Sequence, residues 1–184
     1  MLQVMTTYET FKKTGRVALQ KKLEKKNIHQ VPVLDKVVVA MGIGSLATRK
    51  GVKDFSDLES NLMAITGQKP QLIKSRKSIS NFKLREDMPV MLRVTLRGKK
   101  AYDFVERLRT YVLPRLRDFA GLVGRKFDGK GNYSVGFPNL VIFPEIMPEQ
   151  ITTPMGVQIT FSTTADTDAD AKALLQSLGI IFHQ

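Results

Sequence analysis

Hydrophobic and polar positions alternate most regularly between Met88 and Arg97. The apolar set is Val90, Leu92, Val94 and Leu96, and the intervening set is Met91, Arg93, Thr95 and Arg97. Alternation with a period of two is typical of a strand that is buried on one side. The pattern therefore predicts a strand with one core face and one cationic, hydrogen-bonding face.

Shorter segments of β-branched, aliphatic or alternating residues predict further strands. They are Val33–Met41, Gln71–Ile73, Leu140–Phe143 and Val157–Ser162. Polar residues with Gly121, Gly124, Gly129, Gly131 and Gly136 fill the stretch from Asp118 to Pro138. This glycine content predicts a long mobile loop.

Apolar residues at helical spacing predict four helices. They cover residues 8–26, 52–65 (followed by Gly67 at C′), 100–112, and a last helix capped by Asp166 or Thr167 and stopped by Gly179. The first helix carries a basic stripe, for which phosphate contact and simple solvation are equally good interpretations. Together the pattern predicts an α+β fold, with an antiparallel or mixed sheet backed by helices on one face and open on the other. No linker or repeat interrupts residues 1–184, so we expect a single domain.

Charge changes this picture. The formal net charge is +12, and ten Lys and Arg against two acids between Lys69 and Lys100 supply +8 of it. Within this region, Lys74–Arg85 is predicted to be a long, basic, polar loop. A solvated surface is the ordinary interpretation of a charge run, but this run adjoins a strand whose exposed face has the same sign. We therefore favour contact with phosphates, and nucleic acid as the leading partner class.

Catalytic and metal-binding patterns are missing from the sequence. There is no Cys, the two His are distant, and HExxH, GxSxG and GxxxxGK[ST] do not occur. Asp166, Asp168 and Asp170 lack the rest of a calcium loop and are better explained by helix capping. The lone GxG of Met41–Gly44 is a weak nucleotide signal and favours a turn. We expect no enzyme activity, no metal and no cofactor, in an intracellular protein with no membrane span or signal segment.

The basic and hydrogen-bonding residues of the chain favour a protein that recognises RNA by its shape and by hydrogen bonds. Arg and Lys would bind phosphates, while Thr95, Gln68 and the backbone near Gly42 and Gly44 would reach ribose 2′-OH groups or base edges. With about six phosphates neutralised, log affinity would fall with log salt at a slope of roughly −5.

Several long stretches of the chain resemble one family. They are VPVLDKVVVAMGIG (31–44), ITGQKPQLIKSRKSISNFKLRE (65–86), RVTLRG (93–98), VLPRLRDFAGL (112–122), KFDGKGNYSVG (126–136) and IFPEI (142–146). Together they resemble the family of the fifth protein of the bacterial large ribosomal subunit, which binds 5S rRNA. The resemblance implies a ribosome-bound protein in the cytoplasm or an organelle, with no small-molecule substrate and no membrane. It also implies four partners: 5S rRNA in the central protuberance, large-subunit rRNA, the small-subunit head and the P-site tRNA.

Carried onto this chain, the resemblance and the charge pattern give three groups of candidate residues. The rRNA-binding group is Met41, Gly42, Gly44, Gln68, Lys69, Arg93, Thr95 and Arg97. The tRNA-contacting loop is Lys74, Arg76, Lys77, Ser78, Ser80, Asn81, Phe82, Lys83 and Arg85. A weaker group for the intersubunit bridge or rRNA is Phe127, Gly129, Lys130, Asn132 and Tyr133.

One position departs from the family pattern. Ala40 stands where the family has Asn, so one polar contact to RNA is expected to be lost. Two other functions are compatible with a basic surface: a stand-alone RNA-processing enzyme or RNA chaperone, and a peripheral membrane protein held by the basic first helix. The missing catalytic residues count against an RNA-processing enzyme, and the placement of the charge on a loop and strand counts against membrane binding.

Overall fold

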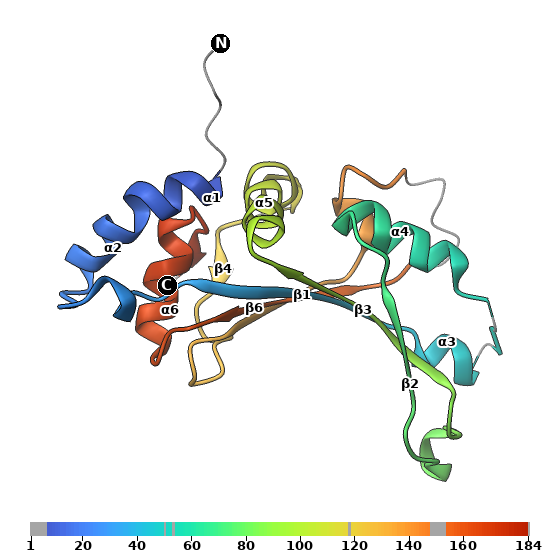
Figure 1. Cartoon of the computed structure of the whole chain (residues 1–184). Helices are drawn as coiled ribbons and strands as arrows, with labels where there is room; N and C mark the ends of the chain where they lie inside the picture. The colour runs from blue at the N-terminus through green and yellow to red at the C-terminus, as the bar shows by residue number, and fades with distance from the viewer. Residues whose placement is uncertain (1–6, 50, 53, 118, 148–153, 184) are drawn as a thin grey trace. The chain divides into compact units, whose positions relative to one another are not determined.

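The computed structural model describes residues 7–49, 51–52, 54–117, 119–147 and 154–183. Five strands form the main sheet in the order β2-β3-β1-β6-β5 (Figure 1). They are β1 Leu34–Gly42, β2 Gln71–Lys74, β3 Pro89–Arg97, β5 Tyr133–Phe137 and β6 Val157–Thr163. A separate pair joins β4 Leu122–Val123 in parallel with β7 Phe182–His183. The fold is α+β, as the sequence predicts.

The described residues fall into two compact units. Unit 1 takes them from the ranges 1–37, 96–135 and 160–184, and unit 2 from 38–95 and 136–159. The longer strands bury alternate residues, whereas β2 has no buried residue. On β3, Leu92, Val94 and Leu96 are at most 1% exposed, whereas Arg93 and Arg97 are exposed and Thr95 is half-buried. The predicted core face and open face of this strand are confirmed.

Unit 1 contains the first and last helical segments. The N-terminal segment runs through α1 Thr7–Thr10, a π-helical turn Phe11–Gly15 and α2 Arg16–Lys22, followed by the 3-10 turn Ile28–Gln30. The third predicted helix is α5 Lys99–Arg107, extended by a π-helical turn Leu108–Val112 and a 3-10 turn Leu113–Arg115 that contains Pro114. The last is α6 Asp168–Ser177, and α1 packs on α5 and α2 on α6. These predicted helices are confirmed.

The described part of unit 2 contains two α-helices, of which the sequence predicts one. The predicted helix is α4 Ser56–Thr66, and it ends at Gly67 in the left-handed conformation, with a φ of 67°. Ahead of it, the Asp54 carboxylate accepts a hydrogen bond from the Ser56 N–H at 2.9 Å, and this bond lowers the pKa of Asp54. The missed helix is α3 Gly44–Arg49, which begins at the glycine that was predicted to form a turn.

Two predictions about the second half of the chain are wrong. Leu140–Phe143, predicted as a strand, forms the 3-10 turn Leu140–Ile142, with the Phe143 N–H bonded to the Leu140 carbonyl at 3.0 Å. Leu140 and Phe143 are 1% exposed, so their apolar character reflects burial and not strand pairing. The predicted loop 118–138, whose first residue lies outside the described residues, contains β4 and β5. In β5, Tyr133, Val135 and Phe137 alternate into the core despite Gly136.

Candidate nucleic-acid interface

The segment Lys74–Arg85, here called the basic hairpin, is a hydrogen-bonded hairpin and not an open loop. Ile79 and Leu84 exchange two backbone hydrogen bonds, at 2.8 and 3.1 Å, around a 3-10 turn at Ser80–Phe82. All nine candidate residues of this hairpin are exposed. Its Lys and Arg side chains form no ion pair with another described residue. Its positive charges are therefore available to a ligand.

β3 and the segment between α4 and β2 bring together three of the predicted rRNA-binding residues of unit 2, namely Gln68, Arg93 and Thr95. Gln68 donates from Nε2 to the Thr95 carbonyl at 3.5 Å, although 27 residues separate them. The Thr95 hydroxyl has no hydrogen-bond partner among the described residues. Arg93 lies opposite Gln71 across the β2–β3 register and donates to its Oε1 at 3.3 Å. Amide, hydroxyl and guanidinium groups thus converge on one exposed strand face.

A shallow hollow of about 300 Å³ lies on the same unit. Its lining residues are Ala40, Gly42, Met91, Phe137, Gly156, Val157 and Gln158. A Cβ added to Gly42 would meet nothing within 4 Å, so the backbone there is bare and open to close approach. The small residues leave space for another molecule's backbone above the strand.

Met41 corrects one predicted contact. It is 0% exposed, because its position in the alternation of β1 turns it into the core. It therefore holds the strand in place and does not contact a ligand directly. Gly44 is half-buried at the start of α3, close to Val90, while Lys69 is exposed as the prediction requires.

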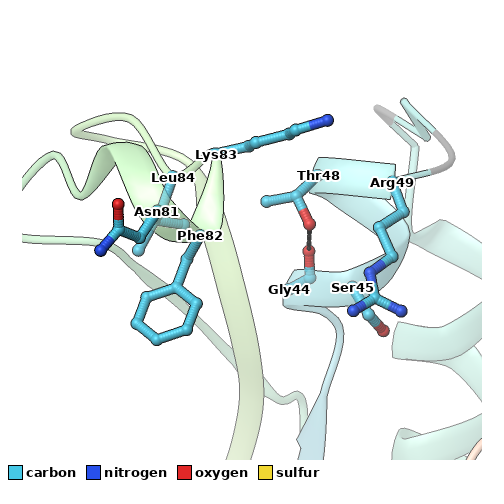
Figure 2. Close-up of a pocket in the computed structure, with 8 residues that line it drawn as sticks. All are labelled: Gly44, Ser45, Thr48, Arg49, Asn81, Phe82, Lys83 and Leu84. Carbon is cyan, nitrogen blue, oxygen red and sulfur yellow. Dashed lines mark hydrogen bonds between the residues drawn. The ribbon is translucent and has the colours of Figure 1, made fainter.

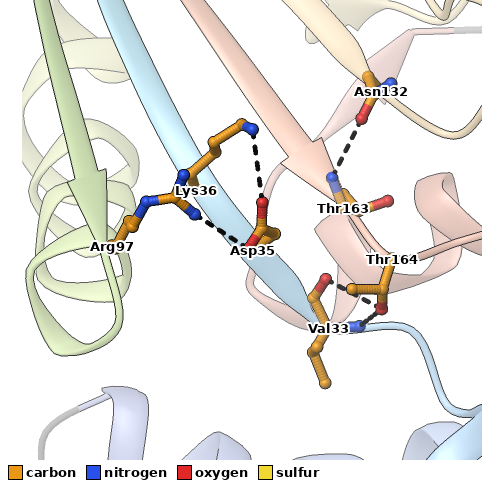
Figure 3. Close-up of polar contacts among 7 residues, drawn as sticks. All are labelled: Val33, Asp35, Lys36, Arg97, Asn132, Thr163 and Thr164. Carbon is orange, nitrogen blue, oxygen red and sulfur yellow. Dashed lines mark hydrogen bonds and ion pairs between the residues drawn. The ribbon is translucent and has the colours of Figure 1, made fainter.

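Arg97, in unit 1, has part of its charge offset. Its guanidinium lies 3.2 Å from Asp35 Oδ1, and the other carboxylate oxygen lies 3.6 Å from Lys36 Nζ (Figure 3). All three side chains are at least one third exposed, so these pairs contribute little to stability. The negative charge of Asp35 does lower the positive electrostatic potential at this end of β3.

A second correction concerns Tyr133, which directly follows the glycine-rich loop, defined as Phe127–Asn132, and was predicted to contact the bridge or rRNA. Tyr133 is 0% exposed, and its hydroxyl donates to the Val123 carbonyl at 3.0 Å. Burial raises the pKa of Tyr133 to about 12, so it stays protonated. The Phe127 ring packs against Tyr133 with centroids 4.8 Å apart and against Phe182 at 5.7 Å. Tyr133 therefore serves packing and is not a contact surface, whereas Phe127 is half-buried and its predicted contact stays a prediction.

Carboxylates hold the backbone of the glycine-rich loop. Asp168 accepts hydrogen bonds from the N–H groups of Gly129 at 3.2 Å and Gly131 at 2.9 Å. Asp128 accepts from the Asn132 side chain at 2.7 Å, and this bond is the main reason that the pKa of Asp128 is lowered. Asn132 also accepts the Thr163 N–H through its side-chain oxygen at 3.2 Å (Figure 3). Of the weaker candidates, Gly129 and Lys130 are exposed, and Asn132 is used by the fold.

The prediction that the acids near the last helix act as its caps is wrong for Asp168 and Asp170, whose carboxylates bind other segments. Thr167 is the N-cap of α6, accepting the Asp170 N–H at 3.2 Å, whereas Asp168 binds the glycine-rich loop. Asp170 forms an ion pair with Lys25 at 3.0 Å. A spacing of 37 residues between Asp168 and Gly131 gives no local signal, so only the folded chain shows this contact.

Among the described residues, no three His, Asp or Glu side chains are grouped in a way that could hold a metal ion. No described helix has the length and apolar character needed to cross a bilayer. Exposed cations on a hairpin and a strand are the features expected of a nucleic-acid-binding protein.

Comparison with known proteins then gives the family. Residues 27–85 match the family model described as ribosomal protein L5, and residues 89–182 match the model of the C-terminus of the same ribosomal family. The chain belongs to the ribosomal protein L5 family. This confirms the predicted family and makes the protein a non-enzymatic constituent of the ribosome, in a family for which rRNA binding is typical.

Relatives named large ribosomal subunit protein uL5 cover the chain. The protein of Thermosipho melanesiensis is 46% identical over 183 residues, 100% of both chains. That of Saccharopolyspora erythraea is 48% identical over 169 residues, 92% of this chain and 89% of the relative. That of Buchnera aphidicola subsp. Schizaphis graminum is 44% identical over 181 residues, 98% of this chain and 100% of the relative.

Proposed function

We propose that this ribosomal protein anchors 5S rRNA in the central protuberance of the large subunit through the open sheet face of unit 2. The observation that carries the proposal is the convergence of Gln68, Arg93 and Thr95 at β3, the strand that also supplies Met91 to the hollow at Gly42. Folded RNA displays 2′-hydroxyls and phosphates along a wide, shallow minor groove. A donor-rich strand face with space for a close backbone complements that groove.

The other partners follow from the remaining exposed charge. The basic hairpin contacts the P-site tRNA, because its cations are free of ion pairs to described residues and polyanions are its natural ligands. Gly129 and Lys130 remain candidates for contact with rRNA or with a small-subunit head protein. Large-subunit rRNA contacts complete the set, with residues 1–184 acting as one binding module.

Binding of purified 5S rRNA tests the sheet face directly. Thr95→Val removes the hydroxyl and keeps the β-branched shape, so it is expected to lower affinity about fivefold, corresponding to a hydrogen bond of about 1 kcal/mol. Thr110→Val, at an exposed position in unit 1, is the matched control and should leave affinity unchanged. Equal affinity for the wild type and Thr95→Val would contradict the proposed role of Thr95, and the absence of 5S binding by the wild type would overturn the proposal.

Ala40 offers a second test of the same face. It is half-buried and lines the hollow next to Gly42. Ala40→Asn restores an amide that can donate and accept hydrogen bonds, so 5S affinity is expected to stay equal or to rise. A marked loss would mean that this side of β1 does not face the RNA.

A further inference from the structure

A cleft of about 400 Å³ opens between the tip of the basic hairpin and helix α3, within unit 2. Its lining residues are Gly44, Ser45, Thr48, Arg49, Asn81, Phe82, Lys83 and Leu84 (Figure 2). The volume lies within the roughly 300–1,000 Å³ that small ligands occupy. It is distinct from the hollow at Ala40 and Gly42, with which it shares no lining residue.

Backbone hydrogen bonds support both walls of this cleft. On one side, the Ile79–Leu84 pair and the bond from Lys83 N–H to the Ser80 carbonyl at 2.9 Å fix the hairpin tip. On the other side, the Ile43 N–H donates to the Val90 carbonyl at 2.9 Å, which attaches the start of α3 to β3. The cleft is therefore built by the fold of the chain.

Phe82 places an exposed aromatic ring at this cleft. It is 72% exposed and is the one aromatic residue of the basic hairpin. The residue after it, Lys83, has a φ of 52°, a left-handed conformation that a side chain rarely adopts. The chain thus presents a phenyl ring to solvent from a well-defined turn, and Figure 2 shows the ring across the cleft from the α3 side chains.

The opposite wall is polar and cationic. Ser45 and Arg49 are four residues apart on α3 and so share a face of that helix. The Thr48 hydroxyl forms a hydrogen bond within its own helix, donating to the Gly44 carbonyl at 2.9 Å. Arg49 and Lys83 form no ion pair with another described residue, and none of the lining residues is acidic. The cleft therefore combines an aromatic face with two free cations.

We propose that this cleft binds one unstacked nucleotide from an RNA loop, with the base against Phe82 and the phosphate between Arg49 and Lys83. Bases of single-stranded or looped RNA stack on aromatic side chains, whereas paired bases are hidden in the duplex. Anionic peptides would use the cations but gain nothing from the ring. The inference rests on the proposed function, and it adds a second contact that reads an unpaired base.

A tryptophan reporter tests the cleft, because the chain contains no Trp. Phe82→Trp keeps an aromatic ring at an exposed position, and a base that stacks on it quenches the emission. We expect strong quenching by a 12-residue oligoadenylate and little by a duplex of that strand with oligouridylate. Tyr111→Trp, placed on the 57% exposed site of Tyr111 in unit 1, is the control and should show little quenching by either RNA.

Charge variants in the Phe82→Trp background complete the test. Arg49→Gln is expected to weaken oligoadenylate binding about fivefold, and Lys77→Gln, which removes a hairpin cation outside the cleft, should weaken it less. Equal quenching by the duplex, equal quenching by polyglutamate, or equal effects of the two charge variants would each overturn the proposal. Binding of 5S rRNA is measured in parallel: retained 5S binding without quenching refutes the cleft alone, whereas lost wild-type 5S binding refutes the proposed function.

Discussion

The basic hairpin and the glycine-rich loop are both polar segments predicted as loops, but different groups hold them in place. In the hairpin, backbone groups bond to one another, as in the pair formed by Ile79 and Leu84. In the glycine-rich loop, the carboxylates of Asp128 and Asp168 take up the backbone N–H groups. The cations of the hairpin thus form no ion pair with a described residue, whereas the carboxylates in and near the glycine-rich loop are used by the fold.

This difference indicates which segment can serve a ligand. A charged group that already has close partners must give them up before it binds a ligand. Leaving a buried or bonded polar group without its partner costs free energy. The hairpin's Lys and Arg have no such partners among the described residues. The hairpin is therefore suited to binding, and the glycine-rich loop is suited mainly to stabilising unit 1.

The largest effect on stability is expected for Gly131→Ala. Gly131 has a φ of 75°, and an added Cβ would lie 2.6 Å from the Ala165 carbonyl oxygen. Conformational strain and overlap with the backbone should together lower the free energy of unfolding by about 3 kcal/mol or more. Urea denaturation measures the change.

Gly129→Ala is the matched control for Gly131→Ala. Gly129 has a φ of 81°, but nothing lies within 4 Å of an added Cβ. Only strain remains, so the loss should be about 1 kcal/mol. Equal losses for the two variants would show that the packing of Gly131 against Ala165 does not hold the loop.

The next largest effect is expected for Asp168→Ala. Two backbone N–H groups lose a charged acceptor, so the free energy of unfolding should fall by about 2 kcal/mol. Asp166→Ala removes an exposed acid close by and should change stability by no more than about 0.5 kcal/mol. If the two variants were equally stable, the carboxylate of Asp168 would not be the anchor of the loop.

The sequence predicted the elements that have strong periodicity and missed those fixed by distant contacts. β3 and α4 were found because every second or every third to fourth side chain is apolar. β5 was missed because Gly136 interrupts the pattern, although Tyr133, Val135 and Phe137 alternate into the core. The resemblance predicts that Met41 contacts RNA as part of the Met41–Gly44 turn, whereas the alternation of β1 turns its side chain into the core.

A smaller, pH-dependent effect is expected for Asp128→Asn. Bonds from the Asn132 side chain, the Asn132 N–H and the Lys130 N–H hold the pKa of Asp128 below its usual 3.8. A lowered pKa in the folded state stabilises the fold above the unfolded pKa, and this contribution is lost as pH falls through the folded pKa. The stability difference between wild type and Asp128→Asn should therefore be full at pH 6 and should shrink below about pH 4. Unfolding curves at several pH values measure it, and a difference that stays constant down to pH 2 would contradict the role of the carboxylate.

The smallest effect on stability, with a clear effect on binding, is expected when Arg76→Gln is combined with Lys77→Gln in the basic hairpin. Both residues are exposed and form no ion pair with another described residue, so the free energy of unfolding should change by no more than about 0.5 kcal/mol. Affinity for tRNA should fall, and the magnitude of the slope of log affinity against log salt should decrease by about one for each phosphate contact removed.

The matched control is Lys126→Gln combined with Lys130→Gln beside and in the glycine-rich loop, which removes the same charge from exposed positions of unit 1. If both double variants weakened tRNA binding equally, the hairpin would act only through net charge, and the distinction between a binding hairpin and a structural loop would fail.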